Sequence, residues 1–593
     1  MTVPLTILRC AAVLSLLCGG GFASAAPPAN TDWPLHGLNY ANTRFSPLTD
    51  ITRDNVAGLQ RVWSVHTGVK GSFQATPLVR DGVMYVSTPF NHVIALDAAT
   101  GVERWRYQHE LKRKENCCGP ANRGVAVGEK LVFIATIDAR LVALDRASGK
   151  LVWDHPLTDS DVGAMENLQQ MLSAPEFAGT TQTGNTGYSA NMAPQVVGDM
   201  VLVGVTGAGY GLHVETKDKG EARITVAGIG GEHLGLRGFL LALDANTGAE
   251  RWRWYVTGEH WEGPMQSSTA WGAEMHRDLP GEQKALKKYG ESWRYGGGSV
   301  WTTPAIDEAR GLLYLGTGNP APQMDDPTRP GDNLHSVSLV ALELKTGKLR
   351  WAYQQVPHDR WGYDVASPPV LFTMTVEGKP RDVVAEAGKV GYLFVHDRET
   401  GELLQRSEPF VPQENLFARP TEAGVRIAPA ALGGCSWSPI AVDSANARAY
   451  LTAIHWPAMY YSRQLPAAKG LPWTSYTFVQ PVEASASYGL LSAVDLTTGK
   501  LAWAQKMDKP MIGGVLATAG NVLFAGESGG ALSAFASADG RKLWSDQVSA
   551  GVNAPPVTYT VNGRQFVAVA AGGNVLFGFK TGDELIAYAL PSP

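Results

Sequence analysis

The sequence lacks clustered positive charge and has few charges of either sign. Of its 593 residues 18% are charged, the formal net charge is −5, and no basic run occurs. A nucleic acid or an anionic membrane surface is recognised through such a cluster, so the composition argues against both partners. The chain also contains no Cys-x-x-Cys-His motif, so we expect no covalently attached haem.

Long apolar runs are missing too, except near the N-terminus. There Arg9 closes a short positive region, residues 10–18 are apolar, and residues 23–25 are small enough for cleavage. This pattern predicts a secretory signal over residues 1–26 and an exported, periplasmic mature chain over 27–593. A membrane anchor is the weaker interpretation because the apolar run is too short to span a bilayer, and no later stretch predicts membrane insertion.

Cysteine is scarce as well. The chain has five, and the predicted cleavage leaves Cys117, Cys118 and Cys435 in the mature protein. Neighbouring cysteines in an exported protein can oxidise to each other, and such a disulfide fixes local backbone shape without closing a long loop. Two reduced, buried thiols are the alternative.

Glycine and tryptophan, by contrast, are plentiful, with 66 and 17 residues, which suits many short strands joined by tight turns. One motif recurs: an apolar strand, an Asp-x-x-Thr-Gly turn, and a strand that usually carries Trp. Its copies lie at residues 95–105, 143–153, 242–252, 341–351, 396–401, 493–503 and 534–544. Four-stranded sheets at this spacing are typical of propeller blades, each of which docks its Trp on the next blade.

The repeats predict one all-β domain, an eight-bladed β-propeller with tryptophan-docking repeats. Residues 59–63 would join 566–570 and 585–588 as the eighth blade, which hides two sheet edges; an open sandwich is the alternative. Insertions interrupt the repeat at about residues 158–188, 208–231, 261–295, 405–432 and 456–487. We expect surface loops there, and such loops on a rigid propeller usually cover a functional site. Within 261–295 we also expect a helix.

The stretch 357–364 has the highest density of reactive side chains. It reads Pro-His-Asp-Arg-Trp-Gly-Tyr-Asp. In an extended segment Gly362 and Asp364 would share one face, and Trp361 and Tyr363 the other. A carboxylate beside an aromatic suits a reactive site.

With these motifs in this order, the chain resembles the pyrroloquinoline quinone (PQQ) dependent alcohol dehydrogenases, the methanol and ethanol dehydrogenase family. The resemblance covers most of the mature chain, and each motif alone is weak. It rests on the motifs at residues 116–124, 296–301, 318–322, 329–333, 357–361 and 513–520.

The resemblance implies PQQ, a flat tricarboxylate quinone, as cofactor. Cys117 and Cys118 match the vicinal disulfide that covers one face of PQQ in the family, and Trp301 matches the indole on the other face. Arg123 matches the arginine beside a PQQ carboxylate. Lys389 matches the cation near the quinone oxygens, where it stabilises charge that develops on reduction. Ser299 matches a hydroxyl near the cofactor.

The resemblance also implies a metal, by default Ca²⁺, with a lanthanide as the alternative ion. Asn319 matches the family's asparagine ligand, and Glu232 of Gly230-Gly231-Glu232 matches its glutamate through a pattern with one extra residue. A rival alignment would put Gly209 at the glutamate position. Asp364 matches an additional acid that coordinates the metal in lanthanide-using relatives.

Several positions depart from the family pattern. The usual catalytic base follows the Trp of the His-Asp-x-Trp motif, and that position is Gly362. We expect Asp364 to reach the same place, because the missing side chain would leave room. Gln74 stands where relatives commonly have Glu. Ile512 and Ser436 replace a Trp and an Asn that often line the cavity in relatives, which predicts a wider cavity.

The resulting hypothesis is a periplasmic quinoprotein dehydrogenase that oxidises an alcohol, bulky or secondary, to the aldehyde or ketone. Asp364 would act as base, and electrons would leave to a soluble c-type cytochrome or another periplasmic acceptor. One alternative is a non-catalytic propeller that acts as a binding or envelope scaffold. Another is a PQQ-binding protein that has lost turnover.

Overall fold

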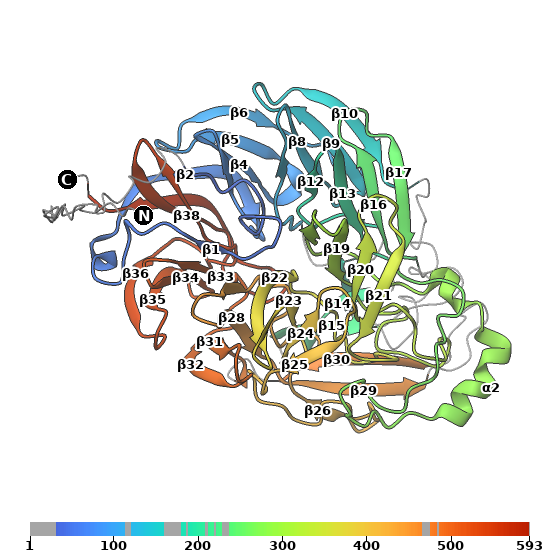
Figure 1. Ribbon diagram of the computed structural model, residues 1–593. Helices are drawn as coiled ribbons and strands as arrows, with labels where there is room; N and C mark the ends of the chain where they lie inside the picture. Colours follow the sequence, from blue (N-terminus) through green and yellow to red (C-terminus); the bar gives the residue numbers. More distant parts are fainter. Residues whose placement is uncertain are drawn as a thin grey trace, which may run out of the picture.

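A computed structural model describes residues 31–112, 120–158, 180–184, 188–207, 212–218, 221–227, 236–464, 475–482 and 486–591. Over these residues the chain forms eight four-stranded antiparallel blades arranged around a common centre (Figure 1), which confirms the propeller predicted from the repeats. We number the blades in chain order, and each runs from an inner strand near the centre to an outer strand.

Blade 1 comprises β3 (Leu78–Arg80), β4 (Val83–Ser87), β5 (Val93–Asp97) and β6 (Glu103–Tyr107). Blade 2 comprises β7 (Ala126–Val127), β8 (Leu131–Ala135), β9 (Arg140–Asp145) and β10 (Leu151–Pro156). Blade 3 comprises β12 (Gln195–Val197), β13 (Met200–Val205), β16 (Phe239–Asp244) and β17 (Glu250–Tyr255). Blade 4 comprises β18 (Ala305–Asp307), β19 (Leu312–Gly316), β20 (Ser338–Glu343) and β21 (Leu349–Gln354).

Blade 5 comprises β22 (Val370–Val376), β23 (Lys379–Ala387), β24 (Leu393–Asp397) and β25 (Leu403–Arg406). Blade 6 comprises β27 (Ala441–Asp443), β28 (Arg448–His455), β31 (Tyr488–Asp495) and β32 (Leu501–Met507). Blade 7 comprises β33 (Val515–Thr518), β34 (Val522–Glu527), β35 (Ala531–Ala536) and β36 (Lys542–Gln547), with β1 (Phe45–Ser46) added in parallel to β33.

The eighth blade joins the two ends of the chain. It comprises β37 (Val557–Val561), β38 (Arg564–Ala571), β39 (Gly582–Ala589) and, as its outer strand, β2 (Gln60–Gly71). β2 pairs antiparallel with β39, and Trp63 lies opposite Ala587. The expected closure is therefore confirmed, and it removes two exposed sheet edges.

The repeated turn sets the contact between neighbouring blades. In the first copy the Asp97 carboxylate accepts hydrogen bonds from the amides of Ala99 and Thr100, both at 3.1 Å, and Gly101 takes the left-handed φ of +75°. The Trp63 indole lies directly against Gly101 and donates from Nε1 to the carbonyl of Ala98 at 3.2 Å. The same packing recurs in the pairs Trp105–Gly149, Trp153–Gly248, Trp252–Gly347, Trp351–Gly401 and Trp503–Gly540.

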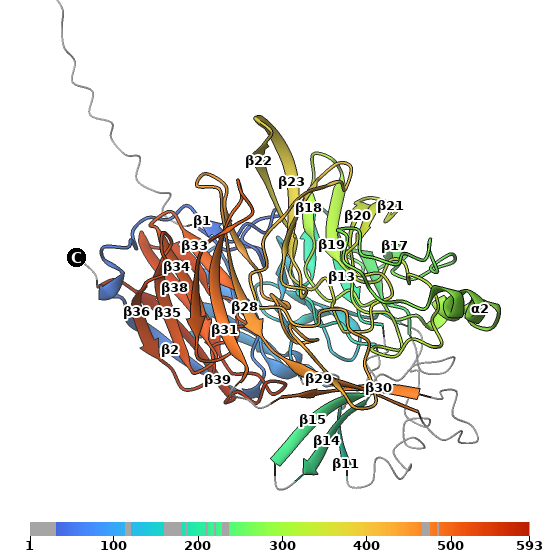
Figure 2. The same ribbon diagram turned by 90° about the horizontal axis from the view of Figure 1, so that it is seen from below.

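The described parts of the insertions contain strands in place of the expected loops. Strands from four of them form a separate six-stranded sheet in the order β11 (Thr180–Gly184), β14 (Leu212–Asp218), β15 (Glu221–Ala227), β30 (Ser475–Pro481), β29 (Ala458–Gln464) and β26 (Val425–Ile427). Figure 2 shows β11, β14 and β15 projecting from one face of the propeller. The expectation of loops at these positions was wrong, because edges of separate insertions pair with one another.

Helical structure is sparse in the described residues. Helix α2 (Leu279–Tyr289) lies within the insertion at 261–295, where the charged run predicted a helix, and sits at the periphery (Figures 1 and 2). Three short 3₁₀ turns are η1 (Val56–Gly58), η2 (Pro89–Asn91) and η4 (Ser292–Tyr295). In the described part of the chain, no helix is long and apolar enough to cross a membrane.

The segment ahead of β2 runs across the inner strands of the propeller. Its carbonyls accept backbone hydrogen bonds from Val79 of β3, Ile306 of β18, Leu371 of β22, Val442 of β27, Ala517 of β33 and Thr560 of β37. The buried Arg44 donates to the carbonyls of His36, Val515 and Pro556. Residues 31–46 thus connect blades that are far apart in sequence.

Candidate functional site

The candidate site lies on the propeller axis and is built from the chain that leads into the inner strands. A small cavity there is lined by His36, Gln74, Arg123, Thr302, Thr303, Pro368, Trp437, Pro439, Ile512, Asn553 and Pro555. Most of these residues precede an inner strand by two to five positions, as Ile512 precedes β33 and Asn553 precedes β37. Because inner strands converge at the axis, residues from seven of the blades' entry segments meet there.

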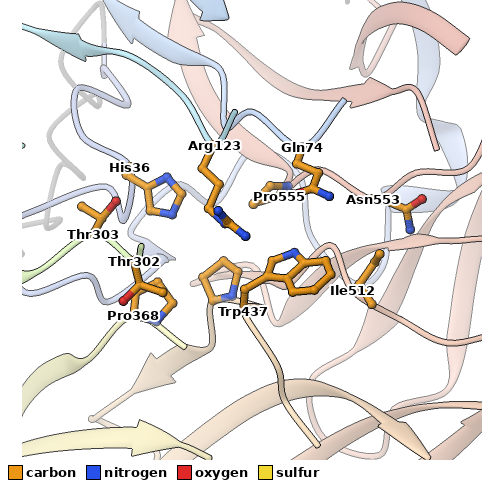
Figure 3. A pocket seen from close by; sticks show the side chains of 11 residues that line it. His36, Gln74, Arg123, Thr302, Thr303, Pro368, Trp437, Ile512, Asn553 and Pro555 are labelled. Carbon is orange, nitrogen blue, oxygen red and sulfur yellow. The ribbon is translucent and has the colours of Figure 1, made fainter. Parts of the chain in front are cut away.

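Arg123 points into the centre of this cavity, between Gln74 and Trp437 (Figure 3). Its guanidinium carbon lies 4.7 Å from the ring centroid of Trp301 and 5.6 Å from that of Trp437. The Lys389 ammonium lies 5.7 Å from the Trp301 ring centroid. Two cations over one nearly buried indole create a positive, flat surface, which suits a planar anionic ligand.

Beside this surface lies Asp364, which is paired through both of its carboxylate oxygens. One oxygen of the Asp364 carboxylate accepts the backbone N–H of Asn319 at 2.7 Å, and the other accepts a hydrogen bond from Lys389 Nζ at 3.1 Å. Lys389 Nζ also donates to the carbonyl of Gly362 at 3.2 Å. Asp364 is 1% exposed and Lys389 5%. Charges buried this deeply are retained when they are paired, as these are.

Asp359, a neighbour in the same loop, organises the backbone. Its carboxylate accepts the amides of Trp361, Gly362 and Tyr363 at 3.1 to 3.3 Å, and also the Nδ2 of Asn319 at 2.5 Å. Burial raises the pKa of Asp359 above its ordinary value, and the backbone amides oppose this shift by stabilising the anion.

The loop differs from the extended segment expected from the sequence. Residues 357–369 form no strand, and Gly362 has a φ of +90°. A Cβ at position 362 would lie 2.7 Å from Ala431 Cβ and 3.2 Å from Met324 Cε. The expectation that the missing side chain leaves room was therefore wrong, because Ala431 and Met324 occupy that space. Trp361 and Tyr363 do share a face, with stacked rings 6.2 Å apart.

The remaining expected site residues fall into two groups. Ser299 is buried beside the axis and donates to the carbonyl of Gly207 at 3.3 Å. Ser436 and Ile512, the positions that depart from the family pattern, are buried too, and Ile512 packs in one cluster with Trp301 and Trp437. The second group lies outside the described residues and comprises Cys117, Cys118, Gly230, Gly231 and Glu232.

Several residues at the site went unrecognised in the sequence, and three of them are Trp437, Thr302 and Gln323. Trp437 and Thr302 line the cavity, and Gln323 donates from Nε2 to Asn319 Oδ1 at 2.9 Å. Each adjoins a motif that was recognised: Trp437 follows Ser436, Thr302 follows Trp301, and Gln323 follows the stretch 318–322. Position next to a motif was the one available signal.

The residues present fit PQQ and a metal ion. Among the described residues, buried polar atoms around the axis have no hydrogen-bond partner within the protein; they include Gln74 Oε1, Asn191 Oδ1, Trp301 Nε1, Thr302 Oγ1, Ser436 Oγ, Trp437 Nε1 and Asn553 Oδ1. Buried polar groups are normally paired, so this set indicates a polar occupant. Asn319 and Asp364 offer the oxygen donors that hard metal ions prefer.

Together, an eight-bladed propeller and a cationic, aromatic axial site define a protein that holds a planar anionic group. The family model described as "Glucose/ethanol/alcohol dehydrogenase, beta-propeller domain", of the PQQ type, matches residues 33–415 and 406–567. The chain belongs to this family. It is a PQQ-dependent oxidoreductase that acts on alcohols.

Individual relatives agree with this assignment. The quinohemoprotein alcohol dehydrogenase of Comamonas testosteroni is 32% identical over 94% of this chain and 75% of its own length, and its crystal structure gives a TM-score of 0.76 over 95% of this chain and 81% of that one. The 1-butanol dehydrogenase (cytochrome c) of Thauera butanivorans is 32% identical over 93% of this chain and 76% of its own length. A europium-containing methanol dehydrogenase is 27% identical, with a TM-score of 0.75 over 95% of this chain and 98% of that one.

Proposed function

We propose that this protein is a periplasmic quinoprotein alcohol dehydrogenase in which Asp364 is the catalytic base. The supporting observation is the position of Asp364, which is held between the backbone of Asn319 and the ammonium of Lys389 beside the Trp301 surface. Family membership and the presence of Arg123, Trp301 and Asn319 around one axis favour an enzyme over a non-catalytic scaffold.

The roles of Arg123, Trp301, Asn319, Asp364 and Lys389 follow from their contacts, whereas those of Glu232, Cys117 and Cys118 rest on the resemblance to the family. Arg123 and Trp301 would hold PQQ, and Asn319, Asp364 and Glu232 would hold the metal, by default Ca²⁺. When bound, PQQ supplies a two-electron acceptor and the metal supplies Lewis acidity. Asp364 takes the proton of the substrate hydroxyl, and Lys389 keeps its carboxylate oriented through the 3.1 Å contact. Cys117 and Cys118 would cover the second face of the cofactor.

The proposal also covers the class of alcohol and the electron acceptor. Ile512 replaces a bulky Trp and packs against Trp301 and Trp437, which supports a cavity for a bulky or secondary alcohol. The name of one relative, 1-butanol dehydrogenase (cytochrome c), supports a soluble c-type cytochrome as electron acceptor. A panel of primary and secondary alcohols tests the first point, and reduction of a purified cytochrome c tests the second.

The central experiment compares D364N with the wild type after reconstitution with PQQ and Ca²⁺. We expect D364N to take up PQQ, seen by its absorbance, but to lower dye-linked kcat by about 10²–10⁴-fold because the base is missing. The exposed D508N serves as the matched control and should keep wild-type turnover. Unchanged turnover in D364N would exclude Asp364 as base. A wild type that takes up no PQQ and oxidises no alcohol would exclude the function itself.

A further inference from the structure

The Asn319 side-chain amide can adopt two orientations, and the proposed function requires the one in which its oxygen faces the metal. An asparagine amide can turn over and exchange its oxygen and nitrogen, and only the oxygen can serve a metal ion. Asn319 is 5% exposed, so its neighbours decide which atom faces which way.

Asp359 is the neighbour that fixes the choice. Asp359 Oδ2 already accepts the amides of Gly362 and Tyr363, so the Asn319 atom that lies 2.5 Å from it is the nitrogen. On the other side Gln323 Nε2 donates to Asn319 Oδ1 at 2.9 Å, which leaves that oxygen a second lone pair. Asp359 and Gln323 are 1% and 4% exposed, so water does not compete for these contacts.

The same carboxylate also shapes the loop that carries Asp364. It accepts the amides of Trp361, Gly362 and Tyr363, and Arg329 Nη2 holds the Asp359 carbonyl at 2.7 Å. The backbone amide of Asn319 in turn donates to Asp364 at 2.7 Å. One buried carboxylate therefore contacts both the Asn319 side chain and the loop that carries Asp364, two of the three proposed metal ligands.

We infer that Asp359 is a positioning residue that directs the Asn319 oxygen to the metal, with Gln323 as its counterpart on the opposite side. The inference rests on the proposed function. Groups that hold a metal ligand in place typically change metal affinity by 10- to 100-fold when they are removed. Neither residue needs to touch the metal, the cofactor or the alcohol.

The test is an exchange of amide and carboxylate between the two positions. In D359N one acceptor oxygen remains for Asn319 Nδ2 and the three loop amides, so the orientation of the Asn319 amide is no longer fixed. In N319D/D359N the introduced carboxylate accepts from the introduced amide and keeps an oxygen for the metal. We measure Ca²⁺ affinity by equilibrium dialysis of PQQ-incubated protein. We expect about 10- to 100-fold weaker binding in D359N and recovery in the double variant.

A second variant covers the case in which D359N does not fold. Q323L removes the donor to Asn319 Oδ1 but leaves the loop amides satisfied, and we expect a several-fold loss of Ca²⁺ affinity with the melting temperature retained. Wild-type affinity in D359N, or a loss in D359N that N319D does not recover, would overturn the inference and leave a structural role for Asp359. Absence of Ca²⁺ uptake by the wild type would instead overturn the proposed function.

Discussion

At the scale of single residues, Gly362 has a backbone φ of +90° and its carbonyl accepts a hydrogen bond from Lys389. The φ opposes an acid at this position, because residues with a side chain avoid it. The packing opposes it too, because a Cβ would lie 2.7 Å from Ala431. We expect G362D to lose about 1–3 kcal/mol of stability from backbone strain alone and to gain no turnover. Thermal melting and dye-linked kcat measure the two effects.

The control for this substitution is G378A. Gly378 has a φ of +76°, but nothing lies within 4 Å of an added Cβ, so only the backbone cost applies. A well-folded G362D with higher kcat than the wild type would show that the family's usual base position is still usable. Asp364 would then lose its place in the proposed mechanism.

Glu386 provides a pH-dependent prediction at the same scale. It is fully buried on β23, Gln355 Nε2 donates to it at 2.7 Å, and burial raises its pKa from 4.5 to about 8. The unfolded chain loses this proton near pH 4.5, while the folded protein keeps it until about pH 8. The free energy of unfolding therefore falls by about 1.4 kcal/mol per pH unit as pH rises through this window.

The variant E386Q carries a neutral amide and escapes this cost. We expect its urea midpoint to exceed that of the wild type by a margin that grows from pH 5 to pH 8, since Glu386 is then increasingly unfavourable when buried. The exposed E422Q should show a margin that does not change with pH. A constant margin for E386Q would mean that Glu386 ionises in the fold as it does in the unfolded chain.

Most of the residues that form the site could be predicted from the sequence, but few of the contacts between them could. Arg123, Trp301, Asn319, Asp364 and Lys389 were selected by local motifs, and the structure brings them together on the axis. The contact of Asp359 with Asn319 joins residues 40 positions apart. The filling of the space at Gly362 by Ala431 depends on the packing of the insertion at 405–432, which no local pattern encodes.

At the scale of elements, the contact between Trp and the turn glycine should carry much of the blade-to-blade stability. A Cβ at Gly347, which has a φ of +69°, would lie 2.4 Å from the Trp252 ring. Gly563 has a φ of +71° and open space around it. Alanine at either site destabilises the fold by about 1–2 kcal/mol, because its backbone must adopt a left-handed conformation. G347A must in addition displace the Trp252 indole, which costs about 1–3 kcal/mol more.

We therefore expect G347A to melt clearly below G563A, as measured by circular dichroism. Equal melting temperatures would show that the indole shifts without loss and that the Trp contact contributes little. This repeated contact explains why the fold was predictable, because strand, turn and Trp lie within a dozen residues. The added sheet was not predictable, since Val226 of β15 pairs with Val479 of β30 across more than two hundred positions.

At the scale of the whole molecule, the axial site connects segments from nearly all the blades. Gln74 leads into blade 1, Arg123 into blade 2, Thr302 into blade 4, Trp437 into blade 6 and Asn553 into blade 8. The N-terminal segment adds His36 to the lining and connects the inner strands through backbone hydrogen bonds. An occupant of this site would consequently stabilise the ring as a unit and not one blade alone.

Loading the protein with PQQ and Ca²⁺ should therefore raise the temperature at which all the blades unfold, in one transition. At ligand concentrations about 100-fold above Kd the gain is about 2.7 kcal/mol, because only the folded ring presents the site. Differential scanning calorimetry measures it, and a chelator should reverse the part due to the metal. R123A, which lacks the guanidinium over Trp301, should show a smaller shift with PQQ, while D508N should show the full one. A shift of equal size in R123A would show that the Arg123 guanidinium does not contribute to PQQ binding.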